Sequence, residues 1–299
     1  LLELFVAETE SGYFIIFHDR YEFHNELIKR GISMYKLNEI KDFVYLTFPI
    51  FDEYDDLFHC FTTRKGGVSK GEFESMNLGF STGDDEENVR KNFHIITESL
   101  GIKVEDIVET HQTHTNNIKY VTENDKGSVL MKTEYTDIDG IYTDKKNVAL
   151  MSFHADCNAV FFYDPVKKLI GLSHAGWKGT MTNITGKMIK ALKDLGSNPS
   201  DLRAAISPSL GQCCFEVDKD VADMFISADI KYKEFMLTKG EKYHFDLWGI
   251  NKYNMIKEGM DEKNIEIAGL CTKCRNDLFF SHRGQKGKRG LMAGIIMMK

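Results

Sequence analysis

The stretch that decides the fold runs Cys157-Asn158-Ala159-Val160-Phe161-Phe162-Tyr163-Asp164-Pro165-Val166-Lys167-Lys168-Leu169-Ile170-Gly171-Leu172-Ser173-His174. Two apolar, strand-like runs flank a turn signal at Asp164-Pro165-Val166-Lys167, which predicts a β-hairpin. A two- or four-residue loop pairs Tyr163 with Lys168 and sets Cys157 opposite His174. Directly opposed residues on antiparallel strands have Cβ atoms about 4.5–5.5 Å apart. The hairpin therefore predicts a thiolate and an imidazole close enough to share a metal ion or to form a nucleophile–base pair.

The remaining periodicity indicates how this hairpin is packed. Strand patterns cover residues 44–48, 57–62, 147–153 and 202–206, with strand-loop-strand material over 107–121, and helix patterns cover 85–100, 179–195 and 247–258. Strands and helices alternate, but the hairpin requires an antiparallel pair. We therefore expect a mixed sheet packed with helices rather than a doubly wound parallel fold.

The bulk composition describes a globular protein with a substantial core. The chain has 299 residues, of which 42% are hydrophobic and 28% charged, and a formal net charge of −7. A negative chain lacks the electrostatic footprint of a duplex nucleic-acid binder. No apolar run approaches the ~20 residues of a membrane helix. We therefore expect neither a nucleic-acid nor a membrane partner.

Six cysteines are too few for a disulfide scaffold in a chain of this length, and adjacent Cys213-Cys214 is a poor disulfide framework. The start, Leu1 to Phe5, lacks the pattern of a signal peptide. Both features predict reduced thiols in a cytoplasmic protein. The pair in Cys271-Thr272-Lys273-Cys274 offers only two ligands and lacks a partner pair, so structural thiols are favoured over a metal site.

Domain organisation is simple after the first 43 residues. No linker, repeat or low-complexity segment interrupts the chain from residue 44 onward. We predict one domain over 44–299, preceded by an N-terminal elaboration over 1–43 that could pair onto the main sheet.

The candidate site begins where the hairpin ends. His174 precedes Ala175-Gly176-Trp177-Lys178-Gly179, and glycines between a strand end and a helix are a common place for a ligand to meet backbone N–H groups. On the other strand, Cys157 follows the polar break His154-Ala155-Asp156. An ordinary bulge and a functional interruption both explain that break.

A second histidine cluster is His111-Gln112-Thr113-His114. Its neighbours alternate as in a strand, so one histidine would face the site and the other would face away; an ordinary core or surface histidine is the alternative. If His114, Cys157 and His174 converge, Zn²⁺ is the natural occupant, and three protein ligands leave a fourth position open. Zinc would lower the pKa of a bound water, and Asp156 could serve as general base or acid. The same ligand set could hold copper.

Two basic-glycine elements could bind an anion such as phosphate. They are Arg64-Lys65-Gly66-Gly67 and Arg283-Gly284. Each signal alone is weak, and a surface turn explains either one equally well.

Several motifs together resemble one family. They are Phe61-Thr62-Thr63-Arg64-Lys65-Gly66-Gly67-Val68-Ser69, Met76-Asn77-Leu78-Gly79, Gln112-Thr113-His114, Asp139-Gly140-(x)₂-Thr143, Ala155-Asp156-Cys157, Ser173-His174-Ala175-Gly176-Trp177-Lys178-Gly179, Ser207-Pro208-Ser209-Leu210-Gly211-Gln212-Cys213-Cys214-Phe215-Glu216-Val217 and Cys271-Thr272-(x)₆-Phe279-Phe280-Ser281-His282-Arg283. From about residue 55 to the end, their order is similar to that of the purine nucleoside phosphorylase family formerly called polyphenol oxidase or laccase-domain, which is related to a peptidoglycan editing factor.

The resemblance implies a single α+β domain with a mixed β-sandwich core and flanking helices. It implies a zinc site at His114, Cys157 and His174. It also implies phosphorolysis of adenosine, inosine and guanosine, cleavage of methylthioadenosine, and hydrolytic deamination of adenosine. Thr115, Asn158 and Lys288-Arg289 depart from the usual pattern, which bears on substrate preference.

We assign roles as hypotheses. Asp156 and Cys157 are the candidate catalytic residues, and Arg64, Asn77 and Arg283 are candidates for phosphate or ribose contact. A copper-dependent polyphenol oxidase ranks lower, because the ten histidines contain no His-x-His pair of the kind that a multicopper centre needs. A metal-free hydrolase with Cys157 as nucleophile and His174 as base is a further reading. The last alternative is a non-enzymatic editing or partner-binding factor.

Overall fold

The predicted hairpin forms the middle of a six-stranded sheet in the computed structural model, which describes residues 5–8, 14–17, 34–129 and 135–299. Its strands, in spatial order, are β16 (Ile265–Ile267), β12 (Arg203–Ile206), β10 (Asn158–Asp164), β11 (Leu169–Ala175), β8 (Gly140–Thr143) and β7 (Ile118–Tyr120). The pairs β12–β16 and β7–β8 are parallel and the others antiparallel. The predicted mixed sheet is confirmed.

A second six-stranded sheet stacks on the first. Its order is β3 (Lys36–Ile40), β4 (Phe43–Thr47), β5 (Leu57–Thr62), β17 (Met292–Met298), β9 (Ala149–His154) and β6 (Ile107–Glu109). Side chains from the facing sides, such as Phe61, Leu150, Phe161 and Leu172, form one buried cluster. This cluster is the interior of a β-sandwich.

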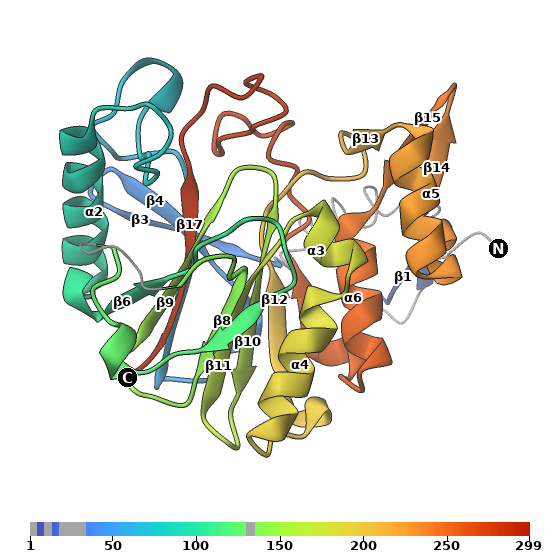
Figure 1. Cartoon of the computed structure of the whole chain (residues 1–299), viewed down its shortest axis with the longest axis horizontal. Coiled ribbons are helices and arrows are strands. Elements are labelled where there is room, and N and C mark those ends of the chain that lie inside the picture. Colours follow the sequence, from blue (N-terminus) through green and yellow to red (C-terminus); the bar gives the residue numbers. More distant parts are fainter. Residues whose placement is uncertain (1–4, 9–13, 18–33, 130–134) are drawn as a thin grey trace.

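Helices cover the outer faces of the sandwich (Figure 1). Helix α2 (Glu86–Leu100) lies over the sheet that contains β17, and Phe93 and Ile96 pack there with Ile295. On the opposite side, α4 (Ile184–Asp194) and α6 (Leu247–Lys257) cover the sheet of the hairpin, with Met188 packed near Phe162. All seven residues of β10 are buried because both of its faces are covered. The expected sandwich flanked by helices is confirmed.

The remaining elements stand at one end of the molecule and at its N-terminus. A three-stranded sheet of β13 (Glu216–Val217), β15 (Lys242–Phe245) and β14 (Met236–Lys239) packs with α5 (Lys219–Ala228), and β1 (Phe5–Glu8) pairs with β2 (Phe14–Phe17). Of the predicted N-terminal elaboration, residues 1–4, 9–13 and 18–33 lie outside the described residues. Within it, β3 does pair with β4.

One predicted helix is wrong in its extent. The pattern over 179–195 is divided into α3 (Trp177–Met181) and α4, with Asn183 between them in the left-handed region at φ 59°. Its side chain accepts a hydrogen bond from the N–H of Gly186 and caps α4. Asparagine tolerates this conformation and competes for backbone hydrogen bonds, so it ends one helix and starts the next. Among the described residues, no helix combines the length and apolarity needed to cross a membrane.

Candidate active site

The hairpin register differs from the prediction by two residues. His174 pairs with Ala159, not with Cys157, because the loop is residues 165–168 rather than 164–167. Asp164 is the last residue of β10, and its carboxylate accepts hydrogen bonds from the N–H groups of Val166 and Lys167, both at 2.8 Å. A shift of two residues leaves side chains on the same face of a sheet. Cys157 and His174 are therefore diagonal neighbours instead of direct partners.

His114, Cys157 and His174 nevertheless come together. Their candidate ligand atoms all lie within 4.8 Å of one another. Sγ of Cys157 is 3.9 Å from Nε2 of His114, and the two imidazole rings are 5.0 Å apart at an angle of 83°. His174 is buried, Cys157 half-buried and His114 exposed. The group therefore has a buried floor and an open side through which a ligand can enter.

The loop that carries His114 is not the strand that the alternation predicted. His114 has φ 64°, in the left-handed region, and its N–H donates to Oδ1 of Asp139 at 3.0 Å. His111 forms an isolated bridge with Ile138 and is not part of the group. The left-handed backbone conformation of His114, rather than strand periodicity, directs its side chain toward Cys157.

Asp139 organises the site, a role that no pattern in the sequence indicates. Its buried carboxylate accepts hydrogen bonds from Nδ1 of His174 at 2.8 Å and from the N–H groups of Thr113, His114 and Thr115. Burial acts to raise the pKa of Asp139, but the hydrogen bonds from His174 and Thr115 outweigh it and lower the pKa to about 2. Such a carboxylate fixes the ring of His174 so that Nε2 faces the group.

Electrostatic coupling sets the charge of Cys157. Burial acts to raise the pKa of this thiol, but His174 and His114 outweigh it and lower the pKa to about 6. Burial likewise acts to lower the pKa of His174, but Cys157 and Asp139 outweigh it and raise the pKa to about 9. Cys157 is therefore a thiolate near neutral pH, which is the form that binds metals and attacks electrophiles.

Gly176 keeps the space among the three side chains open. A Cβ at this position would lie 2.9 Å from Cδ2 of His114, 3.1 Å from Sγ of Cys157 and 3.5 Å from Cε1 of His174. Its φ of −67° suits any residue, so space rather than backbone conformation requires glycine. Two imidazoles and one thiolate around such a space fit a single metal ion with an open coordination position.

Asp156 lies next to the group, held by residues from distant parts of the chain. Its φ is 87°, Oδ1 accepts a hydrogen bond from the hydroxyl of Thr272 at 2.6 Å, and Oδ2 accepts one from the N–H of Arg283 at 2.6 Å. The polar break before Cys157 therefore contains a carboxylate that two hydrogen bonds hold in place.

The predicted anion contacts occupy different surroundings. Arg64 donates to the carbonyls of Glu74 and Asn276 and lies over the ring of Phe280. Asn77 is buried, and its amide bonds to nearby groups such as Thr82. The guanidinium of Arg283 donates to the Glu216 carbonyl, while its backbone reaches Asp156.

Arg289 is a further candidate that the structure brings to the site. Burial lowers the pKa of its guanidinium, while the nearby charges of Asp156 and Cys157 act to raise it. Its Nε is buried and has no hydrogen-bond partner among the described residues. A buried cationic donor without a partner is suited to receive an anionic ligand.

Comparison with known proteins places the chain. The family model described as multi-copper polyphenol oxidoreductase laccase matches residues 58–299. A Bacillus subtilis protein named purine nucleoside phosphorylase YlmD is 40% identical over 246 residues, which cover 80% of this chain and 87% of that protein. A Bacteroides thetaiotaomicron protein named purine nucleoside phosphorylase is 30% identical over 265 residues, which cover 87% and 98%.

Solved structures agree in fold. The Bacillus licheniformis hypothetical protein YfiH has a TM-score of 0.82 and 35% identity, and the match covers 88% of this chain and 99% of that one. YlmD from Geobacillus stearothermophilus has a TM-score of 0.81 and 32% identity, over 89% and 99%. Together with the family match, these similarities confirm the resemblance inferred from the motifs. The chain belongs to the family described as multi-copper polyphenol oxidoreductase laccase, whose relatives at this level of identity are named purine nucleoside phosphorylases.

Proposed function

We propose that this protein is a zinc-dependent purine nucleoside enzyme. It uses phosphate to cleave adenosine, inosine, guanosine and methylthioadenosine, and it hydrolytically deaminates adenosine. The observation that carries the proposal is the convergence of His114, Cys157 and His174 in a chain whose relatives are named purine nucleoside phosphorylases.

His114, Cys157 and His174 are the proposed zinc ligands. A thiolate and two imidazoles suit zinc, and three protein ligands are typical of a catalytic rather than a structural site. Asp139 holds His174 in the tautomer that leaves Nε2 free, which is the usual support for a metal-binding histidine. Zinc, when bound, supplies Lewis acidity and lowers the pKa of a coordinated water.

The basic residues are the proposed phosphate and ribose contacts. In phosphorolysis an oxygen of phosphate forms a bond to the ribose C1′ while the bond from C1′ to the purine breaks, and the purine leaves with the electron pair. We retain Arg64, Asn77 and Arg283 as contacts and add Arg289, whose partnerless Nε supports a role in holding the phosphate. A guanidinium suits this task because its N–H groups match the oxygens of phosphate.

Asp156 is the proposed proton-transfer group. In deamination, water adds to the purine carbon that carries the amine, and ammonia leaves after it takes up a proton. A carboxylate beside the reacting carbon can accept the proton of water and return it to the amine. The hydrogen bonds from Thr272 and Arg283 fix the position of Asp156 next to Cys157 and support this role.

The test follows adenosine by chromatography, with and without phosphate. We expect adenine and ribose 1-phosphate only when phosphate is present, whereas inosine should also form without it. Cys157→Ala and His174→Ala should abolish both products, whereas His94→Ala, at an exposed position on α2, should leave them unchanged. If either site variant retains its zinc and its turnover, the assignment is wrong.

Two other functions can be distinguished from the proposed one by experiments on the same protein. A copper polyphenol oxidase is suggested by the family description, yet His114 and His174 are the only histidines in the metal-type donor groups found among the described residues. A metal-free hydrolase is supported by the spatial series from Cys157 through His174 to Asp139. These three side chains resemble a nucleophile, its base and the acid that orients the base. Activity that depends on copper would support the first, and activity that survives a chelator would support the second.

A further inference from the structure

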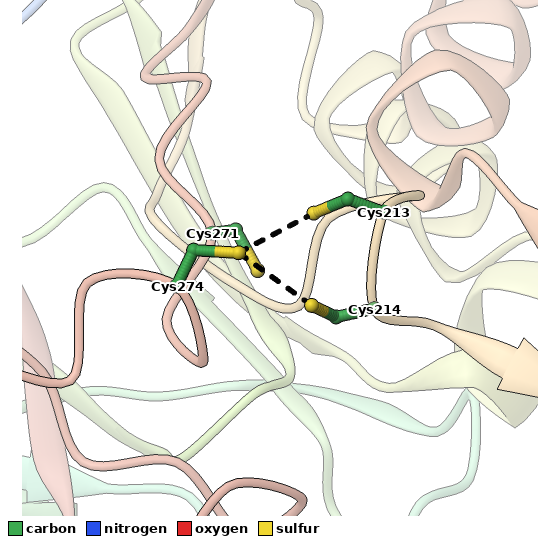
Figure 2. Close-up of side chains that lie close together, drawn as sticks. All are labelled: Cys213, Cys214, Cys271 and Cys274. Atoms are coloured by element: carbon green, nitrogen blue, oxygen red, sulfur yellow. Dashed lines mark hydrogen bonds between the residues drawn. The ribbon is translucent and has the colours of Figure 1, made fainter.

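Four cysteines outside the active site come together from two distant loops. Cys213 and Cys214 lie in the loop before β13, and Cys271 and Cys274 lie in the loop after β16. All four Sγ atoms are within 4.8 Å of one another. Figure 2 shows the side chains of the two pairs directed toward a common point. The pair Cys213-Cys214 is the partner that the Cys271-x-x-Cys274 motif lacked in the sequence.

The sulfur separations fit one tetrahedral ion. Sγ of Cys274 is 3.7 Å from Sγ of Cys213 and 3.5 Å from Sγ of Cys214. Four sulfurs each about 2.3 Å from a central zinc ion are about 3.8 Å apart along the edges of the tetrahedron. A disulfide would hold two sulfurs at about 2.05 Å. All four thiols are free, and the two separations from Cys274 match the edge of such a tetrahedron.

The surrounding backbone is built to bring the two loops this close. A Cβ at Gly211 would lie 3.2 Å from Cβ of Cys271, 3.4 Å from Sγ of Cys213 and 2.9 Å from the ring of Trp248. Only glycine leaves room for the approach. The N–H of Thr272 donates to the carbonyl of Ser209 at 2.9 Å, which joins the loops beside the cluster.

We propose that Cys213, Cys214, Cys271 and Cys274 form a second zinc site, with all four coordination positions filled by thiolates. Sites closed by four protein ligands are structural, because no position is left for water or substrate. This site shares no ligand with the group at Cys157, and the proposal does not depend on the activity of the protein.

The two loops that carry the cysteines also contact Asp156, which lies next to the active-site group. Thr272, beside Cys271, donates its hydroxyl to Asp156 at 2.6 Å, and the N–H of Leu210 donates to the Asp156 carbonyl at 2.8 Å. Both loops of the cysteine cluster therefore hold Asp156. Zinc at the cluster therefore also stabilises the backbone that holds this carboxylate.

The first measurement is the zinc content of the purified protein and its variants. We expect about two zinc ions per chain in the wild type and about one in both Cys157→Ala and Cys274→Ser. Cys274 is exposed, so its serine variant tests the site with little change in packing. Cys60→Ala, at a buried cysteine outside both groups, is the control that should keep the wild-type content.

The second measurement needs no change in the cluster. X-ray absorption at the zinc edge of Cys157→Ala should show four sulfur neighbours at about 2.3 Å and no nitrogen neighbours. Wild-type zinc content in Cys274→Ser, iron in place of zinc at the cluster, or a disulfide from Cys274 to Cys213 or Cys214 in protein purified with a reductant would each overturn the proposal.

Discussion

Nδ1 of His174 donates a hydrogen bond to Oδ1 of Asp139 at 2.8 Å, and both side chains are at most 3% exposed. This contact links the hairpin strand β11 to the start of β8 and, through the same carboxylate, to the backbone of the His114 loop. One buried carboxylate therefore orients two of the three proposed zinc ligands.

Replacing Asp139 should weaken metal binding without removing a ligand. We expect Asp139→Ala to lower zinc affinity at the active site about 10- to 100-fold, which is the usual cost of losing such a supporting group. Asp139→Asn keeps an acceptor for His174 and should lose less. Competition with a chelator measures both affinities, and equal affinity in Asp139→Ala and wild type would contradict the role.

A methyl group at Gly176 should interfere with the same site. The added Cβ would lie within 3.1 Å of both His114 and Cys157, while the backbone there accepts any residue. We expect Gly176→Ala to fold with an unchanged circular dichroism spectrum and to lose the zinc of the active site. Zinc at the cysteine cluster should stay, which gives an internal control. Full retention of both ions would show that the space is not used.

The pattern of residues predicted the partners of this site better than its geometry. Side chains alternate between the two faces along each strand, and this alternation is a local property. The pattern therefore predicts Cys157 and His174 on one face, even though Asp164 shifts the loop by one position. The left-handed backbone of His114 is stabilised by Asp139, a residue 25 positions away. No periodicity in the sequence reports such a contact, so the twist and the role of Asp139 could not be predicted.

The cysteine cluster illustrates the same limit. A Cys-x-x-Cys pair is visible in the sequence, but Cys214 and Cys274 are separated by 60 residues and meet only because β12 and β16 are parallel neighbours. Elements with strong local signals were predicted well, as β5 (Leu57–Thr62) shows. The break at Asn183 is not visible in the sequence because apolar residues at helical spacing, from Ile184 to Leu195, predict one continuous helix.

Arg289 should govern the affinity for phosphate. We expect Arg289→Gln to raise the KM for phosphate about tenfold or more, because a charged hydrogen bond to phosphate is worth about 1.5–3 kcal/mol. The KM for the nucleoside should change much less. Arg90→Gln on α2, where Arg90 is exposed, is the matched control. An unchanged KM for phosphate would remove Arg289 from the site.

Glu266 should make stability depend on pH. Burial raises the pKa of Glu266 from 4.5 to about 7, and one of its oxygens is buried without a partner. Because the folded-state pKa is raised, the contribution of Glu266 to the free energy of unfolding is complete below about pH 4.5. This contribution is lost as the pH rises through 7. Glu266→Gln cannot ionise, so it escapes this loss.

Urea unfolding of Glu266→Gln and wild type at pH 5 and pH 8 measures the effect. The free energy of unfolding of the variant relative to wild type should increase by about 2–3 kcal/mol between the two pH values, from about 1.4 kcal/mol per unit of pKa. A constant difference would mean that Glu266 has the same pKa in the folded and unfolded states.

The most direct test of the central claim combines elemental analysis of the purified protein with an assay of adenosine and phosphate before and after zinc removal. The account predicts zinc in the wild type, adenine and ribose 1-phosphate as products, loss of both products on chelation, and their recovery when zinc is restored. Turnover that is unaffected by metal removal, or copper as the only bound metal with no nucleoside turnover, would contradict it.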